Sequence, residues 1–234
     1  MGPTLEVSVS NPDQQANLEG KCKKIYADFD RFWHAHKDQF PTWELGYAIF
    51  FSPPRFQPEL VLLGHNPSAY ANTPYPQFYD PLWPTKNELV SETYPFAVKL
   101  QRLFASIGAL DALGNSVHMN LNFFRSRPAN AAEHGFRWKD NPPAIRQEME
   151  QKSMNVAIGL LDLIQPKLVV ATGMDVFDRI GGRGIDIVPR RGSFRRCVRG
   201  VAGVHPLIGI PHPTGAHVSL EDWSRIMGAI REAI

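Results

Sequence analysis

Short runs of apolar residues alternate along the chain with longer segments whose apolar residues recur at helical spacing. The runs predict strands buried on both faces, and they cover residues 46–51, 60–63, 117–123, 167–171 and 206–210. The helical segments are 12–37, 94–107, 141–164, 174–180 and a closing helix that begins after Ser219. Because strands that alternate with helices form mostly parallel sheets, we predict a three-layer α/β/α sandwich.

The organisation of the chain indicates one domain over residues 1–234, with a loose N-terminal end over residues 1–10. There is no internal repeat, linker or low-complexity stretch, and hydrophobic residues make up 43% of the chain, enough for a full core. No signal peptide or run of about 20 apolar residues is present, so we expect no membrane partner. We also expect a monomer. The expected location is the cytoplasm, or the nucleoid within it in a bacterium.

Metal and cofactor chemistry has little support in the sequence. Cys22 and Cys197 are the only cysteines, which excludes an iron–sulfur cluster held by four cysteines. The only close histidine pair, His34 and His36, would point apart on a helix. Since the chain also lacks a G-x-G-x-x-G motif and a serine nucleophile elbow, we expect no metal and no cofactor.

Three predicted strands carry polar side chains at or near their carboxyl ends. The strand 60–63 leads into Gly64-His65-Asn66-Pro67-Ser68, and the strand 206–210 leads into Pro211-His212-Pro213-Thr214. In the strand 117–123, alternation places His118, Asn120 and Asn122 on one face. Ligands of open α/β sheets bind outside the carboxyl ends of strands, so these clusters are candidates for one site. An edge strand with a solvated face would explain the third pattern equally well.

In this order, the polar motifs resemble those of the uracil-DNA glycosylase superfamily. Gly64–Ser68 is similar to the first signature motif of the branches that use asparagine, which include the mismatch-specific and single-strand-selective enzymes. His212–Thr214 is similar to the second motif, and Asn120 matches the asparagine that hydrogen-bonds the flipped base. Tyr75–Phe78, in a long loop rich in proline and aromatic residues, resembles the segment that carries the stacking aromatic residue. The resemblance covers roughly residues 46–232 and implies a uracil-DNA glycosylase-like fold.

The function that this resemblance implies is a monofunctional DNA glycosylase, which flips a pyrimidine and hydrolyses its N-glycosidic bond to leave an abasic site. Asn66 would orient the attacking water, because an amide does not remove a proton from water. His212 would stabilise the anionic base as it leaves. The residues implied to contact the flipped base are Gly64, His65, Phe78 and Asn120. The residues expected to contact DNA include Ser68, Thr214 and His217.

Arginines also favour DNA as the partner. They gather between residues 182 and 200 in a predicted hairpin, where Arg195 and Arg196 suit a surface that follows a phosphate backbone. Such a run is also typical of a solvated protein surface. Arg125 and Arg127 follow the third polar strand closely and are expected to contact phosphates beside the flipped nucleotide.

Two positions depart from the family pattern. Ala216 stands where related branches supply a leucine wedge, so His217 or Val218 would have to fill the gap left by a flipped base. Ser68 stands where the most uracil-restricted branch has a tyrosine, which predicts that 5-substituted pyrimidines are accepted. Three alternatives stay open: a glycosylase for a hypermodified pyrimidine in foreign DNA, a non-catalytic nucleic-acid-binding module, and a small-molecule α/β enzyme using the same strand ends.

Overall fold

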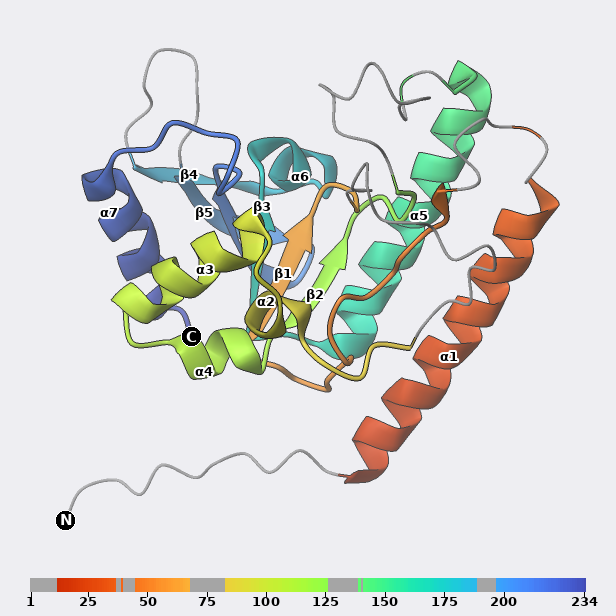
Figure 1. Cartoon of the computed structure of the whole chain (residues 1–234), viewed down its shortest axis with the longest axis horizontal. Coiled ribbons are helices and arrows are strands. Elements are labelled where there is room, and N and C mark those ends of the chain that lie inside the picture. Colours follow the sequence, from red (N-terminus) through yellow and green to blue (C-terminus); the bar gives the residue numbers. More distant parts are fainter. Residues whose placement is uncertain are drawn as a thin grey trace.

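A six-stranded sheet forms the centre of the computed structural model, which describes residues 12–36, 39, 45–67, 83–125, 139, 141–188 and 197–234 (Figure 1). Its strand order is β2-β1-β3-β6-β5-β4. The strands are β1 (Leu60–Gly64), β2 (Val117–Asn120), β3 (Leu168–Thr172), β4 (Arg183–Val188), β5 (Cys197–Ala202) and β6 (His205–Ile210). Strands β2, β1, β3 and β6 are parallel, whereas β5 is antiparallel to both β6 and β4. The predicted mostly parallel sheet is confirmed.

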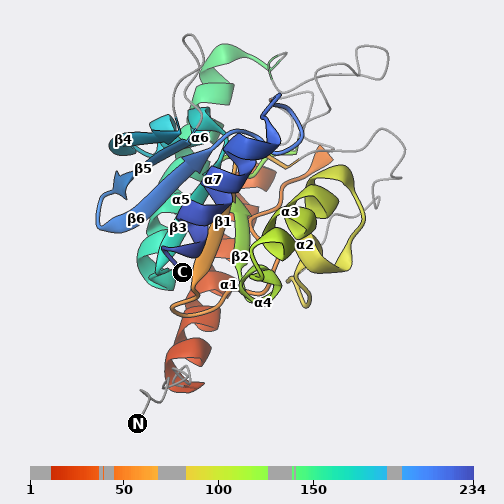
Figure 2. The same ribbon diagram turned by 90° about the vertical axis from the view of Figure 1, so that its left-hand side faces the viewer.

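Helices cover both faces of the sheet (Figures 1 and 2). They are α1 (Pro12–Ala35), α2 (Glu88–Ser91), α3 (Pro95–Ser106), α4 (Leu110–Gly114), α5 (Pro143–Ile164), α6 (Met174–Arg179) and α7 (Leu220–Arg231). Val61 and Leu63 of β1 pack in one core with α1, α5 and α6, and Leu60 and Leu62 pack in a second core with α2, α3, α4 and α7. Because successive side chains of β1 enter opposite cores, the strand is apolar throughout.

Several local sequence signals predicted their elements correctly. The hydroxyl of Ser219 accepts a hydrogen bond from the Asp222 N–H at 3.1 Å, which caps α7 as expected. Strands β4 and β5 pair as the predicted antiparallel hairpin, with a register shift between Asp186 and Val188. Apart from the segment 46–51, the other expected helices and strands agree with the observed bounds to within a few residues at each end.

The predicted strand over 46–51 is wrong. The segment instead makes two isolated antiparallel bridges, Tyr47 to Phe124 and Phe50 to Met119, separated by a bend at Ile49. It nevertheless runs along the outer edge of β2, where the Phe51 N–H donates to the His118 carbonyl at 2.8 Å. This segment covers what would otherwise be a free sheet edge.

Strand β2 is shorter than expected, because it ends at Asn120 rather than continuing to residue 123. It is an edge strand of the sheet, but His118, Asn120 and Asn122 are 6%, 5% and 3% exposed. The alternative of a solvated edge face is therefore wrong. All three polar side chains are buried, which calls for a use or a partner for each of them.

Helices α2 and α4 were not expected from the sequence. The buried side chain of Asn87 holds them together: its Oδ1 accepts from the Leu89 N–H at 3.0 Å and thereby caps α2. Its Nδ2 lies 2.9 Å from the carbonyl oxygen of Leu113 and 3.3 Å from that of Ser116, at the entry to β2. These contacts are tertiary, so helical periodicity alone does not predict either short helix.

Candidate functional site

The carboxyl ends of four parallel strands lie at one edge of the sheet. The chain passes from β1 to β2 through helices on one face and from β2 to β3 through α5 on the other, so β1 and β3 flank a topological switch point. Ligands of doubly wound sheets bind at such a point. Asn66 follows β1, Asn120 ends β2 and His212 follows β6, so the structure brings these predicted residues to the same edge.

Gly64 and Asn120 are neighbours across β1 and β2, and their contact explains the glycine. The two residues are paired in register. A Cβ atom on Gly64 would lie 2.2 Å from Asn120 Oδ1 and 3.7 Å from Thr172 Oγ1. Asn120 is 5% exposed, and its amide lies at the strand end beside Gly64. A nearly buried amide at the carboxyl edge of the sheet is placed where it can recognise a ligand.

Phe96, near the start of α3, connects β2 with the residues after β6. Its ring centroid lies 5.4 Å from that of His212 and 6.0 Å from that of His118. His118 also packs against Phe51, at 5.0 Å between ring centroids. Burial lowers the pKa of His118 to about 3, so this histidine is neutral near pH 7 and fills space between aromatic rings. Phe96 was missed because its sequence context is that of an ordinary core position.

His212 is solvent-exposed, but hydrogen bonds within the turn that it begins fix its backbone and contact its ring. Its carbonyl oxygen accepts from the N–H groups of Gly215 and Ala216, both at 3.2 Å. Thr214 Oγ1 lies 3.2 Å from His212 Nδ1. Partial burial lowers the pKa of His212 below its ordinary value, while the charge of Asp175 acts in the opposite direction. The lowered pKa favours the neutral imidazole at physiological pH.

His65 has a partner that sequence reasoning missed. Its Nδ1 contacts Oδ2 of Asp175, the second residue of α6. The hydrogen bond with His65 lowers the pKa of the Asp175 carboxyl, against a smaller opposing effect of burial. Asp175 is 110 residues away in the chain and belongs to no motif that was singled out, so only the fold reveals this pair.

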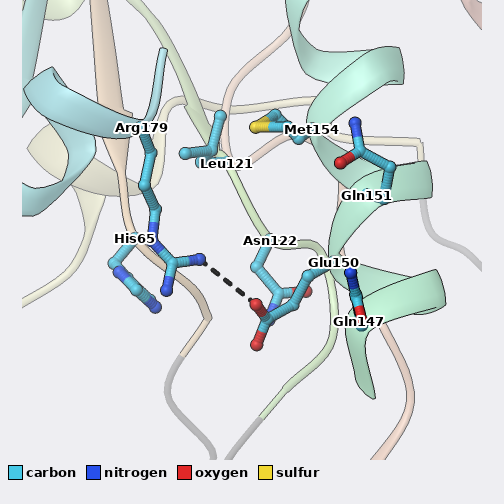
Figure 3. Close-up of a pocket in the computed structure, with 8 residues that line it drawn as sticks. All are labelled: His65, Leu121, Asn122, Gln147, Glu150, Gln151, Met154 and Arg179. Atoms are coloured by element: carbon cyan, nitrogen blue, oxygen red, sulfur yellow. Dashed lines mark hydrogen bonds and ion pairs between the residues drawn. The ribbon is translucent and has the colours of Figure 1, made fainter. Parts of the chain in front are cut away.

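A cavity of about 290 Å³ lies beside His65 on the α5 side of the sheet (Figure 3). It is lined by His65, Leu121, Asn122, Gln147, Glu150, Gln151, Met154 and Arg179. Arg179 and Glu150 form an ion pair across it at 3.3 Å. Asn122 thus faces this cavity, whereas Asn120 lies over Gly64 in the direction of α3. The prediction that the two asparagines share one face is wrong, because the chain leaves the strand after Asn120.

The structure separates the candidate wedge residues. Val218 is partly buried and packs against the core beside α7, whereas Ala216 and His217 are exposed. Arg125 donates its backbone N–H to the Gly46 carbonyl at 3.0 Å, and its charge opposes the burial that raises the pKa of Glu88. Five further predicted site residues lie outside the described part of the chain and stay predictions: Ser68, Phe78, Arg127, Arg195 and Arg196.

The described residues contain neither a metal site nor a membrane-spanning helix. Their histidine, cysteine, aspartate and glutamate side chains include no group of three or more that could hold a metal ion. Among the described helices, none combines the length and apolar character needed to cross a bilayer.

Comparison with known proteins does not place the chain in a family. No protein-family model matches the chain, and no curated protein matches its sequence. The functional interpretation therefore depends on the residues at the carboxyl edge of the sheet.

Proposed function

We propose that this protein is a monofunctional DNA glycosylase that flips a pyrimidine from DNA and hydrolyses its N-glycosidic bond. The observation that carries the proposal is the Asn120 amide, which lies nearly buried over Gly64 at the same sheet edge as Asn66 and His212. A binding module without turnover would not need these three groups at one edge. The proposed activity assigns a task to each of them.

Base recognition is the task of Asn120. Its amide offers one acceptor and two donors, which match the alternating donor and acceptor atoms of a pyrimidine edge. Each hydrogen bond between the base and the amide contributes about 0.5–1.5 kcal/mol net. The contact with Gly64 holds the amide at the strand end, where a flipped base can reach it.

Leaving-group stabilisation is the task of His212. When the Thr214 hydroxyl donates to Nδ1, the proton of the neutral imidazole is on Nε2, which is then a donor. As the glycosidic bond breaks, negative charge develops on the base, and a positioned donor stabilises it. Partial burial lowers the pKa of His212, which favours the neutral ring as that donor.

Asn66 is assigned to the attacking water. It is the second residue after β1 and is half-buried at the carboxyl edge. Its amide can orient a water molecule toward the sugar through hydrogen bonds to the water. Which pyrimidine is excised depends on Ser68 and on neighbouring loop residues. Their contacts with the base stay predictions, because these residues lie outside the described part of the chain. The proposal therefore covers pyrimidine excision as a reaction class.

The proposal is tested with single- and double-stranded oligonucleotides that carry uracil, thymine, 5-hydroxymethyluracil or bulkier 5-substituted pyrimidines. Alkali cleaves the strand wherever excision has left an abasic site. We expect cleavage with at least one substrate, and a loss of about 10²–10³-fold in rate for His212→Ala. Asn120→Ala should lose excision as well, whereas Asn115→Ala, at an exposed asparagine before β2, is the matched control. An absence of abasic sites with every substrate would contradict the proposal.

A further inference from the structure

The proposed reaction leaves one proton without an acceptor. Water that attacks the sugar must lose a proton, and Asn66, as an amide, orients water without removing that proton. His212 is assigned to the leaving base and is needed as a donor. A basic side chain near the end of β1 would supply the acceptor.

We infer that His65 is the general base for this water and that Asp175 positions it, an inference that rests on the proposed glycosylase activity. His65 precedes Asn66 and lies directly after β1. Its side chain is 34% exposed, which leaves the ring accessible from the sheet edge. Figure 3 shows His65 at the margin of the cavity, among the residues that line it.

Asp175 is held in place by its own surroundings. Gly173 has φ +136°, and a Cβ atom there would lie 2.6 Å from Asp175 Oδ1. Backbone N–H groups of Asp175 and Val176 interact with the carboxylate and, like His65, favour its ionised form. A glycine at residue 173 thus provides the space in which the carboxylate meets His65.

The two histidines at this edge consequently have different proton positions. An ionised carboxylate only accepts hydrogen bonds, so His65 Nδ1 carries the proton and Nε2 is left as an acceptor. His212 instead lies beside a hydroxyl, which can donate to its Nδ1 and leave Nε2 as a donor. One ring is suited to take a proton and the other to stabilise an anion, which is the division of tasks that the reaction needs.

The proton and electron balance is simple. The water oxygen forms a bond to C1′ of the sugar, and the bond between C1′ and the base nitrogen breaks with its electron pair going to the base. The water proton passes to His65 Nε2, and the resulting imidazolium is stabilised by the Asp175 carboxylate. The base leaves as an anion hydrogen-bonded to His212, and His65 later returns its proton to solvent.

Four ionisable groups from the surrounding elements face or influence His65. Asp175 and Arg179 come from α6, Glu150 comes from α5, and His212 follows β6. Arg179 and Glu150 form an ion pair with each other, so their opposite charges largely offset at the cavity. Asp175 is thus the group whose charge most directly stabilises a protonated His65.

The experiment measures single-turnover excision against pH for the wild-type chain, His65→Gln and Asp175→Asn. For the wild type we expect the rate to rise with pH through one ionisation and reach a plateau. His65→Gln should lower the plateau about 10²–10⁴-fold and remove this ionisation. Asp175→Asn should lower the plateau, because the imidazole loses the carboxylate that fixes its tautomer and orientation. DNA binding by fluorescence anisotropy should change less than about threefold for both variants.

Asp111→Asn, on α4 before β2, is the charge-matched control and should keep both the plateau and the midpoint. An unchanged plateau and ionisation in His65→Gln would overturn the assignment of the base, although wild-type excision would still support the glycosylase. An Asp175→Asn profile identical to that of the wild type would overturn the positioning role. If the wild type released no base from any substrate, the proposed function would fail, and the base assignment with it.

Discussion

Replacing Gly64 by alanine tests whether the contact between β1 and the Asn120 amide serves the site. The new Cβ would lie 2.2 Å from Asn120 Oδ1, whereas ordinary van der Waals contact begins at 3.4 Å. The backbone of Gly64 is not in the left-handed region, so alanine can adopt its dihedral angles. The cost of the substitution therefore comes from the clash with Asn120. The atom in the way is the end of a side chain, and Asn120 has to move by about 1 Å.

The expected result combines a large functional loss with a smaller structural one. A displacement of about 1 Å in a positioned group costs on the order of 10²-fold in rate. Overpacking in a core costs about 1–3 kcal/mol, and the lower end applies here because an amide can rotate away. Gly64→Ala should therefore fold, unfold at slightly lower urea concentration, and excise base about 100-fold more slowly.

A double-mutant cycle separates displacement of Asn120 from general damage. In an Asn120→Ala background the clash disappears, so adding Gly64→Ala should cost little further stability or activity. Gly159→Ala is the control, because a Cβ atom at this helical glycine meets nothing within 4 Å and should raise stability by about 0.5–1 kcal/mol. Additive losses in the double variant, or full activity in Gly64→Ala, would refute the reasoning.

Three further predictions concern buried and exposed side chains. His118, whose Nδ1 has no partner among the described residues, stays neutral when folded, so protonation of the unfolded chain should lower stability by about 2 kcal/mol between pH 6.5 and 4.5. The variant His118→Phe should show a flatter dependence in urea unfolding over that range. Ser153→Ala should raise the free energy of unfolding by about 1 kcal/mol, because the buried Ser153 hydroxyl likewise finds no described partner. His217→Ala should slow excision from duplex DNA roughly 10-fold and spare single strands, if His217 fills the gap left by the flipped base.

Each of these predictions has a clear contrary result. If the free energy of unfolding depended on pH equally in His118→Phe and the wild type, His118 would not resist protonation in the folded protein. A loss of stability in Ser153→Ala would reveal a partner for the hydroxyl. Equal losses of excision rate on duplex and single-stranded DNA in His217→Ala would show that His217 does not act as a wedge. A His217→Phe variant that excises from duplex DNA at the wild-type rate would support the wedge role.

Elements with strong local patterns were predictable from the sequence. The apolar run 60–63 predicted a strand buried on both faces, and the polar residues after it lie at the carboxyl edge. The segment 46–51 shows the limit of this reasoning, since its apolar content reflects packing beside β2 and its bend prevents a continuous ladder. Burial alone did not distinguish a strand from an irregular segment that covers one.

The site was predictable at strand ends and unpredictable where it depends on tertiary contacts. Asn66, Asn120 and His212 could be grouped because the carboxyl ends of parallel strands share an edge. Asp175 and Phe96 could not, because an aspartate in the first turn of a helix and a phenylalanine on an amphipathic helix are common in any α/β protein. Only their distances to His65 and to His212 mark them as members of the site.

The central claim, excision of a pyrimidine by hydrolysis, is tested most directly by the released base itself. The wild-type protein is incubated with duplex and single-stranded oligonucleotides that carry uracil or a 5-substituted pyrimidine, and the free base is quantified by mass spectrometry alongside the abasic strand. The account predicts equal amounts of free base and abasic sites, and a loss of both in Asn120→Ala and His212→Ala. Release by those variants at the wild-type rate, or no release from any substrate, would contradict it.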